Sequence, residues 1–201
     1  MTNTKPHAIM LPLYYQGHIT PSINLALTLA SKGFTITFVN TQIVHQQMTK
    51  PHTTQDQLEV PLEDGRDIFA GARKSGLDVR YKTVSDGFPL SFDRVLNHQQ
   101  FAEGGLHVFQ AHVDELVGNL VRDDSSISCL ICDTFYTWTS MIANKYKLVN
   151  ISLWTQPALV FTLNYHLDLL VKNGHFASKL GTCVYYFFFR RFVFSYFYAH
   201  F

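Results

Sequence analysis

The first 33 residues change from an apolar run to an amphipathic one. Residues 7–13 (HAIMLPL) lack the two-residue alternation of a half-exposed strand, which is typical of a parallel strand covered on both faces. Thr20 can cap a following helix, Pro21 suits its first position, and Gly33 can end it. The apolar residues at helical spacing between them are Ile23, Ala26, Leu27 and Ala30. This stretch therefore predicts a strand, a short loop and a helix.

The same order of strand and helix recurs along the chain. Further strands are predicted at residues 34–40, 79–84, 128–132 and 148–154. Helices are predicted at residues 41–48, 67–74, 97–121, 137–146 and 158–172. Strands that alternate with helices predict an α/β fold: a Rossmann-like parallel sheet with helices on both faces and right-handed crossovers.

Three polar residues fall just beyond the carboxyl ends of three predicted strands. They are His18, Asp133 and Thr155. In open α/β sheets ligands bind along this edge, so the three side chains are expected to converge on one cleft. Taken singly, each has a structural explanation as well: a solvated loop histidine, a helix cap and a capping hydroxyl. Their convergence favours a functional site.

Composition narrows the classes of partner. A chain of 201 residues suffices for one sizeable domain, with 47% hydrophobic and 15% charged residues. A formal net charge of +1 gives no electrostatic footprint for nucleic acid or an acidic membrane. These values favour a small-molecule ligand, with no nucleic acid partner and no membrane span.

The cysteines and the amino terminus indicate a cytoplasmic protein. The sequence has three cysteines, which is no disulfide framework, and MTNTKPH followed by an apolar run broken at Pro12 is not built like a signal peptide. Cys129 and Cys132 form a C-x-x-C within an apolar run, but residues three apart on a strand face opposite sides. They are therefore interpreted as core thiols, and no metal site is predicted.

The end of the chain differs from the rest. Residues 185–201 (YYFFFRRFVFSYFYAHF) form an aromatic tract with paired arginines in its middle. It is shorter than the ~20 apolar residues of a membrane helix, and the arginines would be costly at mid-depth. Residues 178–201 are accordingly expected to be a tail outside the domain, which spans residues 1–177.

Five motifs in order resemble one family. They are residues 16–21 (QGHITP), 33–41 (GFTITFVNT), 85–89 (SDGFP), 132–138 (CDTFYTW) and 153–158 (LWTQPA). Together they resemble the plant UDP-dependent glycosyltransferases that act on small molecules. The resemblance implies the amino-terminal, acceptor-binding half of a two-domain GT-B fold. The tryptophan-led signature of the second, nucleotide-sugar domain of that family is absent from these 201 residues.

The resemblance also implies a mechanism. His18 corresponds to the general base that takes a proton from an acceptor hydroxyl, and Asp133 to the carboxylate that orients and stabilises it. The acceptor oxygen would attack a UDP-sugar with inversion and receive a hexose, with glucose expected. Thr155 corresponds to a position near the transferred sugar. No metal or cofactor is implied, because the UDP-sugar is a co-substrate. Aromatic residues expected to line the acceptor pocket, or else to belong to the core, are Tyr14, Tyr15, Phe88 and Phe135.

Two other classes of function are considered. A dinucleotide oxidoreductase requires G-x-G-x-x-G at the first turn, where only Gly17 occurs, and an α/β hydrolase requires the absent G-x-S-x-G. The remaining alternative is a truncated fragment or incomplete gene product that is unstable, or that binds small molecules or a full-length relative without catalysing a reaction, since it carries only the acceptor half.

Overall fold

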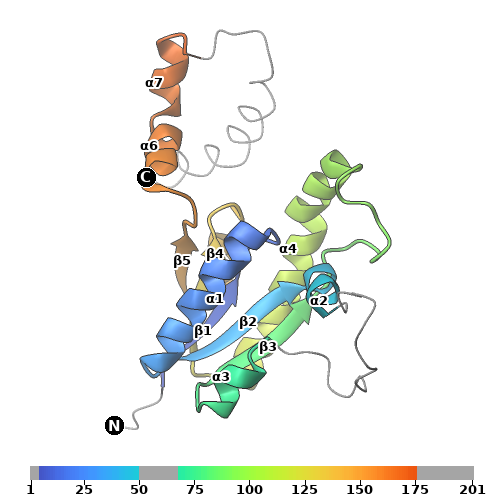
Figure 1. Ribbon diagram of the computed structural model, residues 1–201, viewed down its shortest axis with the longest axis vertical. Coiled ribbons are helices and arrows are strands. Elements are labelled where there is room, and N and C mark those ends of the chain that lie inside the picture. Colours follow the sequence, from blue (N-terminus) through green and yellow to red (C-terminus); the bar gives the residue numbers. More distant parts are fainter. Residues whose placement is uncertain (1–4, 50–67, 176–201) are drawn as a thin grey trace, which may run out of the picture.

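The computed structural model describes residues 5–49 and 68–175 (Figure 1). In these ranges five parallel strands form one sheet in the order β3-β2-β1-β4-β5. The strands are β1 (His7–Leu11), β2 (Thr35–Thr41), β3 (Val79–Val84), β4 (Ile127–Asp133) and β5 (Val149–Leu153). The helices are α1 (Gln16–Ser31), α2 (Gln42–Thr49), α3 (Ala70–Lys74), α4 (His98–Asp123), α5 (Thr139–Lys145), α6 (Ala158–Tyr165) and α7 (Leu167–Lys172).

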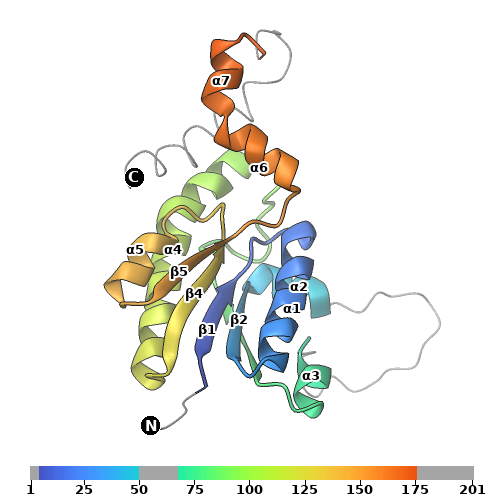
Figure 2. The same ribbon diagram turned by 90° about the vertical axis from the view of Figure 1, so that its left-hand side faces the viewer.

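Successive residues of the central strand β1 face the two sides of the sheet. Ile9 and Leu11 join a core with residues of α4 and α5, whereas Ala8 and Met10 join a second core with residues of α1. Figure 2 shows the corresponding layers, with α1 and α3 on one side of the sheet and α4 and α5 on the other. The predicted parallel α/β fold with helices on both faces is therefore confirmed.

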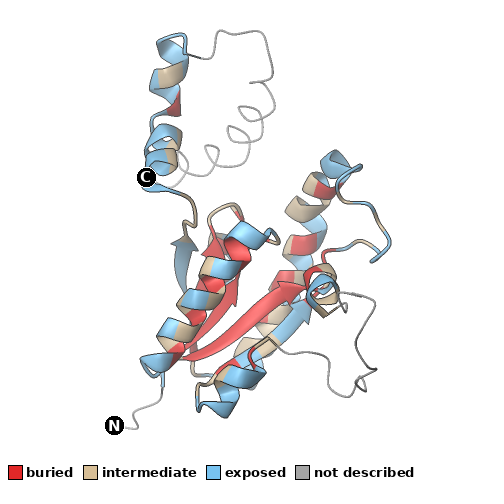
Figure 3. Ribbon diagram, in the orientation of Figure 1, coloured by how far each residue is buried: buried red, intermediate tan, exposed pale blue. Residues whose placement is uncertain are grey.

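The strand order fixes where a ligand site is expected. Strands β2 and β3 lie on one side of β1, and the later strands β4 and β5 lie on its other side. The register pairs Leu11 with Cys132 and Asp133 with Leu153, so β1, β4 and β5 end at the same edge. This reversal beside β1 is the switch point at which open α/β sheets bind ligands. Strands β1 and β2 are buried throughout, and β5 is a mostly exposed edge strand (Figure 3).

The first helix begins earlier than the sequence predicts. Thr20 does not cap it and Pro21 lies inside it, because the carbonyl of Tyr15 already accepts the N–H groups of His18 and Ile19 at 2.9 and 3.0 Å. The prediction was wrong because backbone bonds to Tyr15, and not a side-chain cap at Thr20, begin the helix. His18 consequently lies in the first turn of α1 rather than before it.

The predicted helix at residues 158–172 is divided in two. His166 leaves helical geometry (φ −104°, ψ 25°), its N–H bonds the carbonyl of Thr162, and its own carbonyl accepts the N–H groups of Leu169 and Leu170. The residues before the break include β-branched and asparagine side chains of modest helix propensity, which apolar spacing alone does not weigh.

The two cysteines of the C-x-x-C lie on opposite faces of β4. Cys132 belongs to the core beneath α4 and α5, while Cys129 packs at the core beneath α1. Both are free thiols, and burial raises the pKa of each. Within the described ranges no helix is long and apolar enough to cross a membrane. The tail predicted at residues 178–201 lies outside those ranges.

Candidate active site

His18 and Asp133 meet at the carboxyl edge of the sheet. His18 is the third residue of α1 and Asp133 the last of β4, and His18 Nδ1 lies 2.6 Å from Asp133 Oδ2. Their side chains are 11% and 1% exposed. The other carboxylate oxygen of Asp133 accepts the N–H of Phe135 at 3.1 Å, which fixes the carboxylate plane. A charge-assisted bond between buried groups of this kind holds both side chains in one orientation.

Thr155 joins this pair from the loop that follows β5. Its Oγ1 lies 2.8 Å from the same Nδ1 of His18. The Nδ1–H is therefore directed between the Thr155 hydroxyl and the Asp133 carboxylate, which places the proton on Nδ1 and the free lone pair on Nε2. Nε2 has no hydrogen-bond partner among the residues that the structure describes. The arrangement can accept a proton at Nε2 while the resulting positive charge is stabilised at Nδ1.

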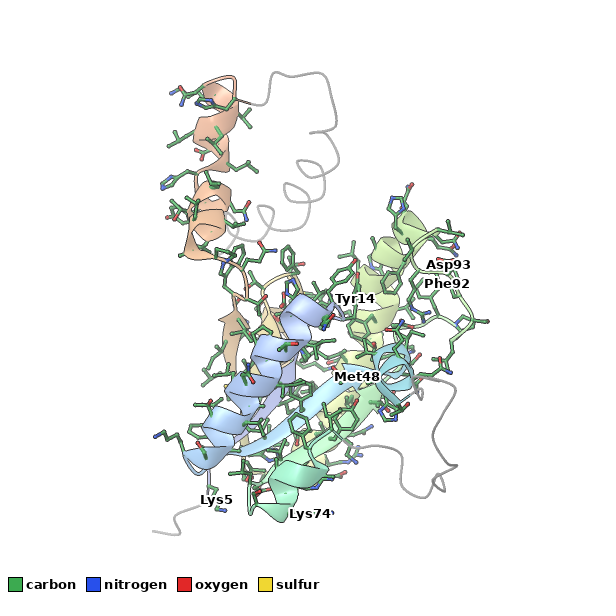
Figure 4. All side chains as sticks on the ribbon, in the orientation of Figure 1. Lys5, Tyr14, Met48, Lys74, Phe92 and Asp93 are labelled. Atoms are coloured by element: carbon green, nitrogen blue, oxygen red, sulfur yellow. The ribbon has the colours of Figure 1, made fainter. Side chains whose placement is uncertain are left out.

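A cavity of about 450 Å³ opens at His18, which is within the usual size range for small-molecule sites. Tyr14, Tyr15 and Phe135 line it, as do several residues of α4 and α6. The aromatic rings surround the imidazole: the His18 ring lies edge-on to Phe135 at 5.6 Å between centroids and 6.4 Å from Tyr15. Figure 4 shows Tyr14 at the beginning of α1, and its ring packs against Phe101 of α4 at 4.9 Å.

The structure does not bring Phe88 to this cavity. Its ring stacks on Phe92 at 4.4 Å between centroids and meets Phe101 edge-on at 5.6 Å. A Cβ atom built on Gly104 would lie 2.5 Å from the Phe88 ring, so the ring occupies the space that this glycine leaves on α4. Phe88 therefore supports Phe101, which does line the cavity, from behind.

Sequence reasoning missed an ion pair that builds one wall of the cavity. Asp86 lines the cavity, and both its oxygens accept from the Arg94 guanidinium, at 2.7 and 2.9 Å. Arg94 also donates to the backbone carbonyls of Phe88, Pro89 and Phe92. The pair closes residues 86–94 into a compact loop beside the first turns of α4. The SDGFP turn was recognised, but nothing in its composition indicates which cation closes it.

Other lining residues also escaped the sequence analysis. They are Leu13, Thr41, Phe101, Ala102, Gly105, Leu106, Phe109, Tyr136, Trp138, Gln156, Val160 and Asn164. The helical spacing of residues 101, 105 and 109 could have indicated a common face of α4. Helical spacing does not tell whether such a face packs on the core or borders a cavity.

Among the titratable groups of the cavity, Tyr14 and Tyr136 are held in their neutral form. Burial raises the pKa of Tyr14 above its ordinary value, with a further contribution from the neighbouring Tyr15. Burial likewise raises the pKa of Tyr136, whose hydroxyl donates to the carbonyl of Pro12. Neither phenol is available as a base near neutral pH. The described ranges also contain no cluster of three or more histidine, cysteine or acidic side chains that could hold a metal ion.

A solved glucosyltransferase structure shares this arrangement of sheet and helices. A UDP-glucose: anthocyanidin 3-O-glucosyltransferase solved with UDP superposes with a TM-score of 0.60 and 20% identity. The match covers 84% of this chain and 34% of that structure. At this identity the likeness establishes the fold alone, and the chain corresponds to about a third of that structure.

Sequence comparison identifies the family, although no protein-family model matches the chain. UDP-glycosyltransferase 86A1 of Arabidopsis thaliana is 57% identical over 176 residues, or 87% of this chain and 34% of the relative. UDP-glycosyltransferase 86A2 of the same plant is 50% identical over 174 residues, which are 86% of this chain and 34% of that relative. The chain belongs to the plant UDP-glycosyltransferase family, and it spans about a third of the length of these relatives.

Proposed function

We propose that this chain is the acceptor-binding part of a UDP-sugar-dependent glycosyltransferase, with His18 as the general base. The observation that carries the proposal is the bond of 2.6 Å between His18 Nδ1 and Asp133, because it leaves Nε2 as the proton acceptor of a histidine that lines the cavity. The aromatic lining and the volume of the cavity suit a small hydroxylated molecule such as a plant phenol. A base placed in this way contributes ~10²–10⁴ to a rate.

The proposed reaction transfers a hexose, with glucose the expected sugar. An acceptor hydroxyl gives its proton to Nε2 of His18, and its oxygen forms a bond to the anomeric carbon of the UDP-sugar. The bond from that carbon to the UDP oxygen breaks on the opposite side, so the configuration inverts. Asp133 stabilises the imidazolium that forms, as the acid does in a catalytic triad.

Thr155 is proposed to contact the transferred sugar in the same step. It follows β5 at the same edge of the sheet, and its hydroxyl already lies 2.8 Å from His18 Nδ1. This position supports a role in orienting the imidazole in addition to the proposed contact with the transferred sugar. The UDP-sugar is a co-substrate, and the proposed step uses neither a metal ion nor a cofactor. The free thiols of Cys129 and Cys132 support a reducing, cytoplasmic location.

A second proposal concerns the 201 residues by themselves. They match about a third of each of the two relatives, and the family signature for the nucleotide sugar does not occur in them. We therefore propose that this polypeptide alone binds the acceptor without transferring sugar.

One pair of experiments tests both proposals. The isolated chain is incubated with UDP-glucose and 7-hydroxycoumarin, and so is a chimera in which residues 1–176 precede the second domain of a close relative. The chimera should form the glucoside, detected by mass spectrometry, and the isolated chain should bind the coumarin without converting it. A chimera that folds but never transfers glucose to any small phenol contradicts the first proposal. Turnover by the isolated chain contradicts the second.

Asp133→Asn separates charge from shape within the proposed pair. The substitution keeps a side chain of the same size but removes the negative charge and allows the wrong histidine tautomer. In the chimera it should lower turnover by up to ~10⁴, as the same change does in a triad, while the thermal unfolding midpoint stays close to that of the parent. Equal turnover by both chimeras would show that the carboxylate does not assist the imidazole.

A further inference from the structure

Strand β5 is an edge strand without the features that usually keep other strands away. Among the described residues it pairs only with β4, and α6 and α7 lie beyond its carboxyl end in both views (Figures 1 and 2). The opposite edge strand, β3, carries the exposed charges of Arg80 and Lys82, which are a common protection against unwanted pairing. The sequence of β5 (VNISL) contains neither a charge nor a proline. The β5 edge is therefore the one open to a further strand.

The backbone of β5 directs hydrogen-bonding groups to that open edge. The carbonyl of Leu153 accepts the N–H of Thr134, which directly follows β4, so the backbone groups of Leu153 face inward. These groups alternate in direction along a strand, so those of Ile151 also face β4. The N–H and C=O of Asn150 and Ser152 point the other way, where the described residues offer no second strand.

The side chains of β5 match a second copy of the same strand. An antiparallel pair centred on Ile151 places this side chain beside its own counterpart. Val149 then faces Leu153 of the other copy, and Asn150 faces Ser152, so apolar residues meet apolar ones and polar residues meet polar ones. In this register the outward backbone groups of Asn150 and Ser152 also face each other, and they can exchange both hydrogen bonds.

Charge and apolar surface agree with this arrangement. Lys147 is the charged residue nearest to β5 in the sequence, and in the same register it lies opposite the uncharged Thr155 of the other copy. Val149 and Ile151 are 62% and 44% exposed in the single chain. Pairing therefore removes apolar surface from water without placing like charges opposite each other.

We propose that two copies of this chain form a symmetric dimer in which their β5 strands pair antiparallel about Ile151. The two five-stranded sheets then join into one continuous sheet across a two-fold axis. Two short strands make a small contact, so the dimer is weak and depends on protein concentration. The proposal goes beyond the proposed function, because no residue of β5 lines the cavity.

The test is sedimentation velocity of the complete 201-residue chain between ~1 and ~100 μM, a range that brackets the affinity of a weak complex. The unmodified chain should change from monomer to dimer over this range. Ile151→Lys places two like charges directly opposite each other and should weaken the dimer at least ~10-fold. Thr83→Lys is the matched control, because it adds the same charge at an exposed position of β3, and it should leave the dimer unchanged.

A mixture of two variants tests the antiparallel register itself. Ile151→Lys and Ile151→Glu should each be monomeric, with circular dichroism spectra like that of the unmodified chain. An equimolar mixture should form a heterodimer, because opposite charges then face each other, and a misfolded variant could not produce this recovery. A chain that stays monomeric over the whole range, or a dimer that persists in Ile151→Lys, overturns the proposal. Variants that remain monomeric when mixed overturn the pairing about Ile151.

Discussion

Replacement of Arg94 by methionine should destabilise the protein strongly. The guanidinium and the Asp86 carboxylate are only 13% and 6% exposed, and they share hydrogen bonds of 2.7 and 2.9 Å. Methionine fills a similar volume but leaves the carboxylate with the N–H of Phe88, at 3.1 Å, as its remaining hydrogen-bond partner among the described residues. Loss of one member of a buried pair typically costs ~3–5 kcal/mol because the other charge stays unpaired.

The measurement is urea unfolding at neutral pH, followed by circular dichroism. Arg122→Met is the matched control, because Arg122 Nε lies 3.6 Å from Asp123 Oδ1 and the two side chains are 71% and 72% exposed. It should change the unfolding free energy by less than ~1 kcal/mol. The double variant Asp86→Asn with Arg94→Met should recover part of the loss, because no charge is then stranded. If Arg94→Met costs no more than Arg122→Met, the ion pair does not hold this loop.

Two further predictions concern stability away from the proposed chemistry. Burial and the positive charge of Arg80 lower the pKa of His7, so as the pH falls through ~6.5 the unfolded chain binds a proton that the folded protein does not. The free energy of unfolding should therefore decline below that pH. When urea unfolding is measured across the range, His7→Gln should show a smaller decline. Gly87 has φ +90° and its added Cβ would lie 2.5 Å from Val108, so Gly87→Ala should cost ~2–4 kcal/mol. Gly33→Ala is the control, because Gly33 has φ +92° but its added Cβ would meet no other atom, so it should cost only the ~1–2 kcal/mol of backbone strain. Equal losses of unfolding free energy for Gly87→Ala and Gly33→Ala would refute the predicted clash with Val108.

The strands were predictable because they are short apolar runs between turn residues. Residues 79–84 were predicted with the bounds that β3 has. At each end, β4 extends one residue beyond its predicted range and β5 stops one residue short of it. Helix ends were less predictable, since backbone bonds decide them. The carbonyl of Tyr15 starts α1 without any side-chain cap, and His166 divides α6 from α7 without a glycine or proline.

The candidate site was likewise predictable only in part from the sequence. The rule that ligands bind beyond parallel strands was enough to group His18, Asp133 and Thr155. In the structure Asp133 Oδ2 and Thr155 Oγ1 lie 2.6 and 2.8 Å from the same His18 Nδ1. The walls of the cavity depend instead on the paths of loops and on which face each helix presents. The pairing of Asp86 with Arg94 and the place of Asn164 in the cavity wall became visible only once those paths were known, because sequence spacing does not indicate which groups a loop or a helix face brings together.

The central claim is that His18 is the base, and turnover by the chimera tests it most directly. His18→Ala should lower the rate of glucoside formation by ~10²–10⁴ while the coumarin still binds. His45→Ala is the control, because His45 contacts the Tyr81 hydroxyl at 3.2 Å and does not line the cavity, and its rate should equal that of the parent. A His18→Ala chimera that transfers glucose as fast as the parent would contradict the account.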